Sequence, residues 1–194
     1  MTIRELSVSP CERKDIKNFI EKWHYSKSIN GLMSDYCFQL SYKNELIGAM
    51  IYGRLAMANA WKRYGDDIND VIELRRLCCI DDTPKNTESY FIGKTLRWLR
   101  NNTNIKTVVS YADPEYGHSG IIYKASNFKL IGKTAKGRVI MFSGKKYHDK
   151  AIRTKYKGEL KPFAKKIIEN IKSGKAFYRD TVGKYIYIYK INRR

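Results

Sequence analysis

Residues 110–128, with the sequence SYADPEYGHSGIIYKASNF, contain most of the side chains that could do chemistry. The segment begins in an apolar run that predicts a buried strand, and a polar loop with glycines follows directly. Such a loop lies at the carboxyl edge of a sheet, where ligands bind in α/β folds. There Asp113 can accept a proton or orient an amine, and Tyr123 lies one turn into the next helix. The structural alternative is an Asp-Pro turn with Ser119 as a cap.

Three further side chains of this loop are candidates for substrate binding: Tyr116, His118 and Ser119. His118 and Ser119 precede the predicted helix, and backbone N–H groups at a helix start favour an anion. We therefore expect the loop to contact a phosphate or another anionic group.

Two more groups of polar residues lie earlier in the chain. His24 and Tyr25 follow a predicted helix, although a structural role fits this pair equally well. In the strand sequence ELRRL, alternation places Arg75 with Glu73 on one face and Arg76 on the other. One arginine would then point into a cleft and need an anionic partner, unless the strand lies at the surface. The sequence leaves open which arginine that is.

Metal ligands are a further option for this set of residues. Imidazole and carboxylate groups bind iron, so His24, Asp113 and His118 are candidate iron ligands, without a spacing motif to support them. The chain also has four cysteines: Cys11, Cys37, Cys78 and Cys79. None forms a CxxC pair, so we expect reduced, buried thiols and no cysteine-based zinc site.

Hydrophobic periodicity predicts the elements that must position these residues. The predicted strands are residues 3–8, 36–42, 45–52, 71–80, 107–112, 128–132, 138–143 and 185–191. The predicted helices are residues 12–23, 87–100, a short helix ending at 125, and 160–172. This order is typical of an α/β fold with a mixed central sheet and helices on both faces. It resembles the GNAT acyltransferase fold, which separates two central parallel strands and places donor and acceptor in the gap.

Positive charge is concentrated toward the C-terminal end of the chain. The sequence has 38 Lys and Arg against 19 Asp and Glu, and residues 129–194 hold 20 of these cations and only four of the acids. We expect a single domain with a catalytic core at residues 1–144 and a basic α-β extension at residues 145–194 that binds DNA. The candidate DNA contacts there are Lys145, Lys146, Arg153 and Lys155.

The aromatic residues of this basic region suit base stacking. The alternative is that the basic side chains form a solvated surface while the tyrosines pack in the core. Alternate positions along a strand would then point to the core, as for Tyr185, Tyr187 and Tyr189.

Composition narrows the class of protein. Hydrophobic residues make up 43% of the chain, which is enough to bury a core. No apolar run reaches the roughly 18 residues that a membrane span needs, and the first residues contain no apolar signal-peptide segment. We expect a soluble cytoplasmic protein with no membrane partner.

Four segments together resemble the Mom proteins of bacteriophages: the His24-Tyr25 pair, ELRRL, NTESYFIGKTLRWLR and ADPEYGHSGIIYKASNF. The last is long and unusual in composition. The similarity extends over residues 24–132, with a looser similarity in the basic tail. It implies a GNAT-like fold and an enzyme that converts adenine in double-stranded DNA to N6-(methylcarbamoyl)adenine, which protects phage DNA from host restriction enzymes.

The resemblance also implies site residues, carried over position by position. His24, Tyr25, Asp113 and Tyr123 would line the active site, with Arg75 or Arg76. A carboxylate such as Asp113 could take the proton of the adenine amine, and a tyrosine could stack on the base or donate to a developing negative charge. The adenine would have to leave the duplex to be reached.

The donor of the transferred group is not indicated. GNAT enzymes that use acyl-CoA hold its pyrophosphate with a glycine-containing loop, whereas residues 81–86 here read DDTPKN. Two acids repel a pyrophosphate, which leaves acetyl-CoA or a related acyl-CoA as one candidate small-molecule donor among others. Two alternatives remain: an acyl-CoA-dependent N-acetyltransferase with another amine acceptor, and a non-catalytic DNA-binding protein. The sequence leaves the oligomeric state open, with a homodimer as one option.

Overall fold

The computed structural model describes residues 1–153 and 155–193. The chain forms two compact units. The core unit comprises Met1–Gly132 and Tyr185–Arg194, and the insertion unit comprises Lys133–Lys184. The division expected at residue 144 stays a prediction, since these bounds rest on compactness alone.

The core unit is built on a seven-stranded sheet with the strand order β1-β2-β3-β4-β5-β12-β6. Its strands are β1 (Leu6–Cys11), β2 (Tyr36–Tyr42), β3 (Glu45–Gly53), β4 (Val71–Cys79), β5 (Thr107–Ala112), β6 (Lys129–Lys133) and β12 (Tyr185–Lys190). β4 and β5 pair in parallel, whereas the pairs β1-β2, β2-β3, β3-β4 and β5-β12 are antiparallel. The sheet is therefore mixed, as predicted.

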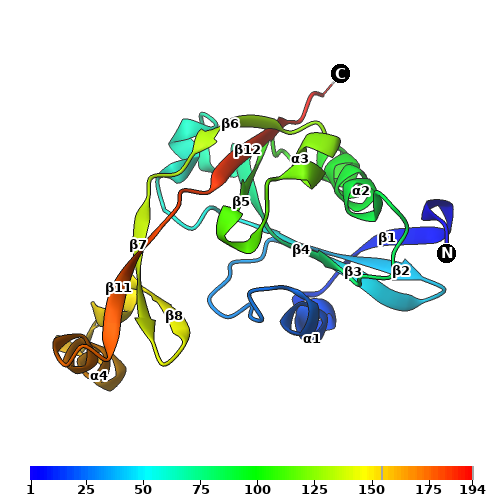
Figure 1. The fold of residues 1–194 in the computed structure, drawn as a ribbon. Helices are drawn as coiled ribbons and strands as arrows, with labels where there is room; N and C mark the ends of the chain where they lie inside the picture. Colours follow the sequence, from blue (N-terminus) through cyan, green and yellow to red (C-terminus); the bar gives the residue numbers. More distant parts are fainter. Residues whose placement is uncertain (154, 194) are drawn as a thin grey trace. The chain divides into compact units, whose positions relative to one another are not determined.

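Helices cover both faces of this sheet (Figure 1). They are α1 (Arg13–Trp23), α2 (Thr87–Asn102) and α3 (Ile121–Ala125). Ile16 and Ile20 of α1 pack with Ile51 of β3, and Phe91 of α2 packs with Tyr52, the next residue of that strand. Because neighbouring strand residues point to opposite faces, α1 and α2 lie on opposite sides of the sheet.

A bulge separates the two parallel strands. The register of β4 with β5 ends at the pair Leu74 and Ser110, although both strands continue beyond it. On its other side β4 pairs Arg76 with Ile51 and Leu74 with Tyr52, so Arg75 is the extra residue of a bulge. A bulge bends its strand and increases its twist. It accounts for a gap between β4 and β5 at their carboxyl ends.

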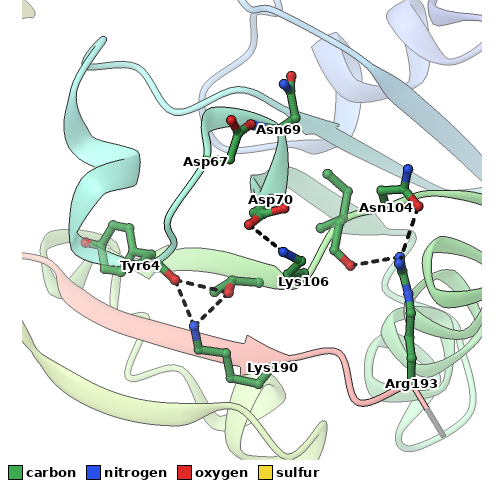
Figure 2. A network of polar contacts seen from close by, with 10 residues as sticks. Tyr64, Asp67, Asn69, Asp70, Asn104, Lys106, Lys190 and Arg193 are labelled. Carbon is green, nitrogen blue, oxygen red and sulfur yellow. Dashed lines mark hydrogen bonds and ion pairs between the residues drawn. The ribbon is translucent and has the colours of Figure 1, made fainter.

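The last strand, β12, pairs with β5 along its whole length, and polar contacts hold its Lys190 end at the start of β5 (Figure 2). The ammonium group of Lys190 donates to the Tyr64 carbonyl and to the Thr107 hydroxyl, both at 2.8 Å. Beside them, Lys106 forms an ion pair of 2.9 Å with Asp70. The two hydrogen bonds of Lys190 fix the end of β12 next to β5, and the ion pair joins the residues that precede β4 and β5.

The insertion unit has its own core. It contains β7 (Gly137–Phe142), β8 (Lys145–His148), β9 (Lys155–Tyr156), β10 (Glu159–Leu160), α4 (Pro162–Lys172) and β11 (Ala176–Thr181). A three-stranded sheet has the order β11-β7-β8, and β9 pairs with β10. Ile140, Ile167 and Ala176 are buried together between this sheet and α4.

Short 3-10 helices complete the chain: Ile3–Glu5, Ala60–Arg63, Ile68–Asp70, Pro114–Tyr116 and Asp149–Ile152. The first of these corrects the strand expected at residues 3–8, which begins only at Leu6. There the amide of Thr2 donates to the Glu5 carboxylate at 2.6 Å, which closes a helical turn. No helix among the described residues is long and apolar enough to cross a membrane.

Candidate active site

The end of α1 meets the loop that follows β5 in a cluster of four rings: His24, Tyr25, Tyr116 and His118. The ring of Tyr25 lies 4.2 Å from that of His24, 4.4 Å from that of Tyr116 and 5.2 Å from that of His118, measured between centroids. Tyr25 and Tyr116 are 43% and 47% exposed. This ring cluster offers a planar heteroaromatic substrate a stacking surface.

His24 is the buried member of the ring cluster. Its Nδ1 accepts a hydrogen bond of 3.1 Å from the amide of Ser26, so the proton of the neutral ring is on Nε2. Burial, reinforced by the nearby charge of Arg76, lowers the pKa of His24 to about 4. At neutral pH this imidazole is uncharged.

The two neighbouring arginines of β4 have different surroundings. Arg75 donates to the carbonyl of Arg54 at 2.5 Å and lies 3.8 Å from the Glu73 carboxylate. Arg76, in contrast, interacts electrostatically with both His24 and Tyr25. The arginine that belongs to the ring cluster is therefore Arg76, and Arg75 braces the bulge.

The alternation expected along β4 is wrong from Arg75 onward. Leu74 and Leu77 both pack in the hydrophobic cluster beneath α2, although regular alternation would place residues three positions apart on opposite faces. The extra residue of the bulge brings both side chains to the same face of the sheet. Arg76 and Cys78 consequently share the α1 side with their strand partners, Ile51 and Ala49.

Both arginines retain a buried Nε–H group with no hydrogen-bond partner in the described part of the chain. A buried donor without an acceptor costs about 1–3 kcal/mol. An oxygen atom of a bound substrate would remove that cost at Arg76. Burial also lowers the pKa of Arg76, an effect partly offset by Tyr25.

Asp113 comes directly after β5 and is buried. Its Oδ1 accepts from the amide of Glu115 at 3.1 Å, and its carbonyl accepts from the amides of Tyr116 and His118. The Asp-Pro turn considered from the sequence is thus present, with Asp113 as its cap. The same residue fixes the two loop members of the ring cluster through its backbone.

Tyr123 lies at the point where β4 and β5 part. Its hydroxyl is hydrogen-bonded to Ser110, whose own hydroxyl donates to the Leu74 carbonyl at 3.2 Å. Burial raises the pKa of Tyr123 to about 12. The phenol is protonated at neutral pH, which suits a hydrogen-bond donor.

The loop between Asp113 and α3 is held from β12. Tyr187 is fully buried, and its hydroxyl donates to the carbonyl of Ser119 at 2.7 Å. Gly120, with φ of +80°, precedes α3 in the N-cap position that the sequence suggested for Ser119. Ser119 itself is exposed, and anion binding by His118 and Ser119 stays a prediction.

Comparison with known proteins fits this architecture. A sequence model described as the Mom protein family matches residues 5–194. The chain belongs to the Mom family. It is 32% identical over 108 residues to "Methylcarbamoylase mom" of Escherichia phage Mu, a region covering 54% of this chain and 44% of that protein. The chain thus spans less than half of this curated relative.

Solved structures show the same fold for this Mom-family chain. A GNAT acetyltransferase from Streptococcus pneumoniae matches with a TM-score of 0.54 and 8% identity, covering 97% of this chain and 100% of that one. The ribosomal-protein-S18-alanine N-acetyltransferase from Escherichia coli matches with a TM-score of 0.52 and 10% identity, covering 97% and 96%. The GNAT-like fold expected from the order of elements is confirmed.

The candidate iron site considered from the sequence is not assembled in the described residues. Among residues 1–153 and 155–193, no group of three or more His, Cys, Asp or Glu side chains is placed to hold a metal ion. His24, Asp113 and His118 therefore do not form the ligand set considered from the sequence. The four cysteines are free thiols, but of these only Cys37 is buried as expected, whereas Cys11, Cys78 and Cys79 are partly exposed.

The candidate DNA contacts lie in the insertion unit. Lys145 and Lys146 are exposed on β8, and Lys155 is exposed on β9. Arg153 forms an exposed ion pair of 2.5 Å with Asp149. DNA binding by these four residues stays a prediction.

Three residues that position the site were missed from the sequence: Ser110, Gly120 and Tyr187. Ser110 lies inside an apolar strand, where a polar residue within a buried run is the available signal. One of the two interpretations of the basic region places Tyr187 in the core, and the burial of its side chain confirms that placement. Its hydrogen bond to a loop 68 residues away had no local signal.

Proposed function

We propose that this chain transfers a methylcarbamoyl group to the N6 amine of adenine in double-stranded DNA, and so protects phage DNA from restriction. Membership of the Mom family and the name of the phage Mu relative support the reaction. One structural observation carries the proposal: the ring cluster, Arg76, Asp113 and Tyr123 all occupy the carboxyl end of β4 and β5, where the strands part.

Base recognition is assigned to the ring cluster. A flipped adenine presents two aromatic faces and an exocyclic amine. Tyr25 and Tyr116 are exposed and in contact with one another, so either can stack on the base. The neutral His24 behind them adds no charge that would repel a proton-bearing amine.

Chemistry is assigned to the buried polar groups. The N6 nitrogen attacks the carbonyl carbon of the donor; an N–C bond forms, and the bond from that carbon to the donor's leaving group breaks. Asp113 takes the proton that N6 loses. The Nε–H of Arg76 is a donor for the carbonyl oxygen as negative charge develops on it, and the protonated phenol of Tyr123 becomes a second donor when its proton turns from Ser110 to that oxygen.

A restriction-protection assay tests this assignment. Plasmid DNA from cells that express the wild-type chain should resist endonucleases whose sites contain adenine, and DNA from cells with the Asp113→Asn variant should be cut. Equal cutting of both plasmids would contradict the proposal. Equal protection by both proteins would show that the modification does not depend on Asp113.

An acyl-CoA-dependent N-acetyltransferase is the second candidate, favoured by the fold. AAC(6')-Ib in a complex that contains acetyl-CoA matches with a TM-score of 0.51 and 12% identity, covering 67% of this chain and 86% of that one. The loop before α2 argues against it, since Asp81 and Asp82 occupy the stretch where a pyrophosphate would bind. Acetyl-CoA turnover without DNA would establish this second activity.

A further inference from the structure

The three-stranded sheet of the insertion unit has one face covered by α4. Ile140 of β7 and Ala176 of β11 are buried there against Ile167 of the helix, and Phe142 and Tyr147 pack beside them. Residues that alternate with these along the strands point to the other face.

That other face is basic and aromatic. The strand register sets Phe177 beside Met141 and Met141 beside Lys146 in one row. The next row contains Arg179, Val139 and His148. Phe177 is 59% exposed. We call Met141, Lys146, His148, Phe177 and Arg179 the basic face.

None of the five residues that define the basic face is acidic. The insertion unit has 16 Lys and Arg against four Asp and Glu. Asp149 pairs with Arg153, and Glu159 pairs with Lys165. Glu169 lies on α4, and Asp180 pairs in register with Arg138 on the α4 side of the sheet. Of the 16 cations, Lys146 and Arg179 belong to the basic face, where they supply the positive charge that a polyanion would contact.

We propose that the basic face binds unpaired nucleotides of DNA. Phe177 stacks on one base, while Lys146 and Arg179 contact phosphates. An exposed aromatic ring on a sheet surface suits unpaired bases, because a duplex keeps the faces of its bases covered. The inference rests on the proposed function, since removing an adenine from the duplex leaves unpaired nucleotides beside it.

Fluorescence anisotropy with a labelled single-stranded oligonucleotide of thymidines tests the proposal. Phe177→Ala should weaken binding by roughly tenfold, the effect of one lost stacking contact, and Phe177→Trp should retain it. The matched control is Phe163→Ala, which removes an exposed phenylalanine from α4 in the same unit and should leave binding unchanged. Arg179→Gln should lower the salt slope by about 0.7, and Phe177→Ala should leave that slope unaltered.

Wild-type affinity in Phe177→Ala, or an equal loss in Phe163→Ala, would overturn the proposal. An equal loss for a duplex of the same length would also overturn it, because the face would then contact paired DNA. Nucleoside analysis of the same proteins separates this inference from the reaction. Oligonucleotide binding that depends on Phe177, without any modified adenine, would contradict only the proposed function.

Discussion

The hydroxyl of Tyr187 donates a hydrogen bond of 2.7 Å to the carbonyl of Ser119, which joins the last strand of the chain to the loop of the candidate active site. The next residue, Gly120, lies so close that a Cβ atom there would be 2.2 Å from the Tyr187 ring. The position of the loop therefore depends on β12, which the chain forms only after completing the insertion unit.

Gly120→Ala should destabilise the core unit by roughly 2–4 kcal/mol, since it combines a positive φ with overlap against a buried ring. Gly117→Ala is the matched control, because Gly117 also has a positive φ but an added Cβ would meet no atom within 4 Å. It should cost about 1–2 kcal/mol. Urea denaturation measures both, and equal losses would contradict the role given to Tyr187.

Arg76→Lys should lower adenine modification by about a hundredfold, because lysine keeps the charge but removes the buried Nε–H group. Arg75→Lys is the comparison, since it retains a cation for Glu73 outside the ring cluster. Modified adenine in plasmid DNA, at matched protein levels, is the readout. A larger loss in Arg75→Lys would show that the wrong arginine has been placed in the site.

His24 should make the fold sensitive to acid. Its folded pKa of about 4 lies below the ordinary value of 6.5, so the unfolded chain binds the proton more readily. Stability should therefore fall as pH decreases through the window from 6.5 to 4. His24→Asn, which can still accept from the Ser26 amide, should show a shallower fall in urea denaturation across that window. The exposed His148→Asn serves as the control; an unchanged slope in His24→Asn would refute the assignment.

Much of the fold follows from the periodicity of apolar residues, which places most strands and all four helices of more than one turn. The bulge at Arg75 did not follow, because it depends on how β4 pairs with β3 and not on β4 alone. The sequences KKYH and AFYRDT also gave no strand signal. They become β8 and β11 by pairing with β7, and the paired residues Gly137 and Thr181 are 44 positions apart in the sequence.

The site shows the same division between local and distant information. Asp113 and Tyr123 were predicted because a polar loop after a buried strand is a local pattern. The choice between Arg75 and Arg76, and the support from Tyr187, depend on long-range contacts that no local pattern encodes.

The insertion unit should supply the salt-dependent part of DNA affinity. Lys145→Gln combined with Lys155→Gln should lower the slope of log affinity against log salt by about 1.8 for duplex DNA. Lys17→Gln combined with Lys62→Gln removes two exposed lysines from the core unit and provides the control. Filter binding at several salt concentrations measures both slopes. A larger change in the control pair would place the DNA contact on the core unit.

Mass spectrometry of nucleosides from plasmid DNA tests the central claim most directly. Cells that express the wild-type chain should yield deoxyadenosine heavier by one methylcarbamoyl group. The Asp113→Asn variant keeps the turn acceptor but lacks the charge, and should yield at least a hundredfold less of that nucleoside. Unmodified deoxyadenosine with soluble wild-type protein, or equal modification by Asp113→Asn, would contradict the account.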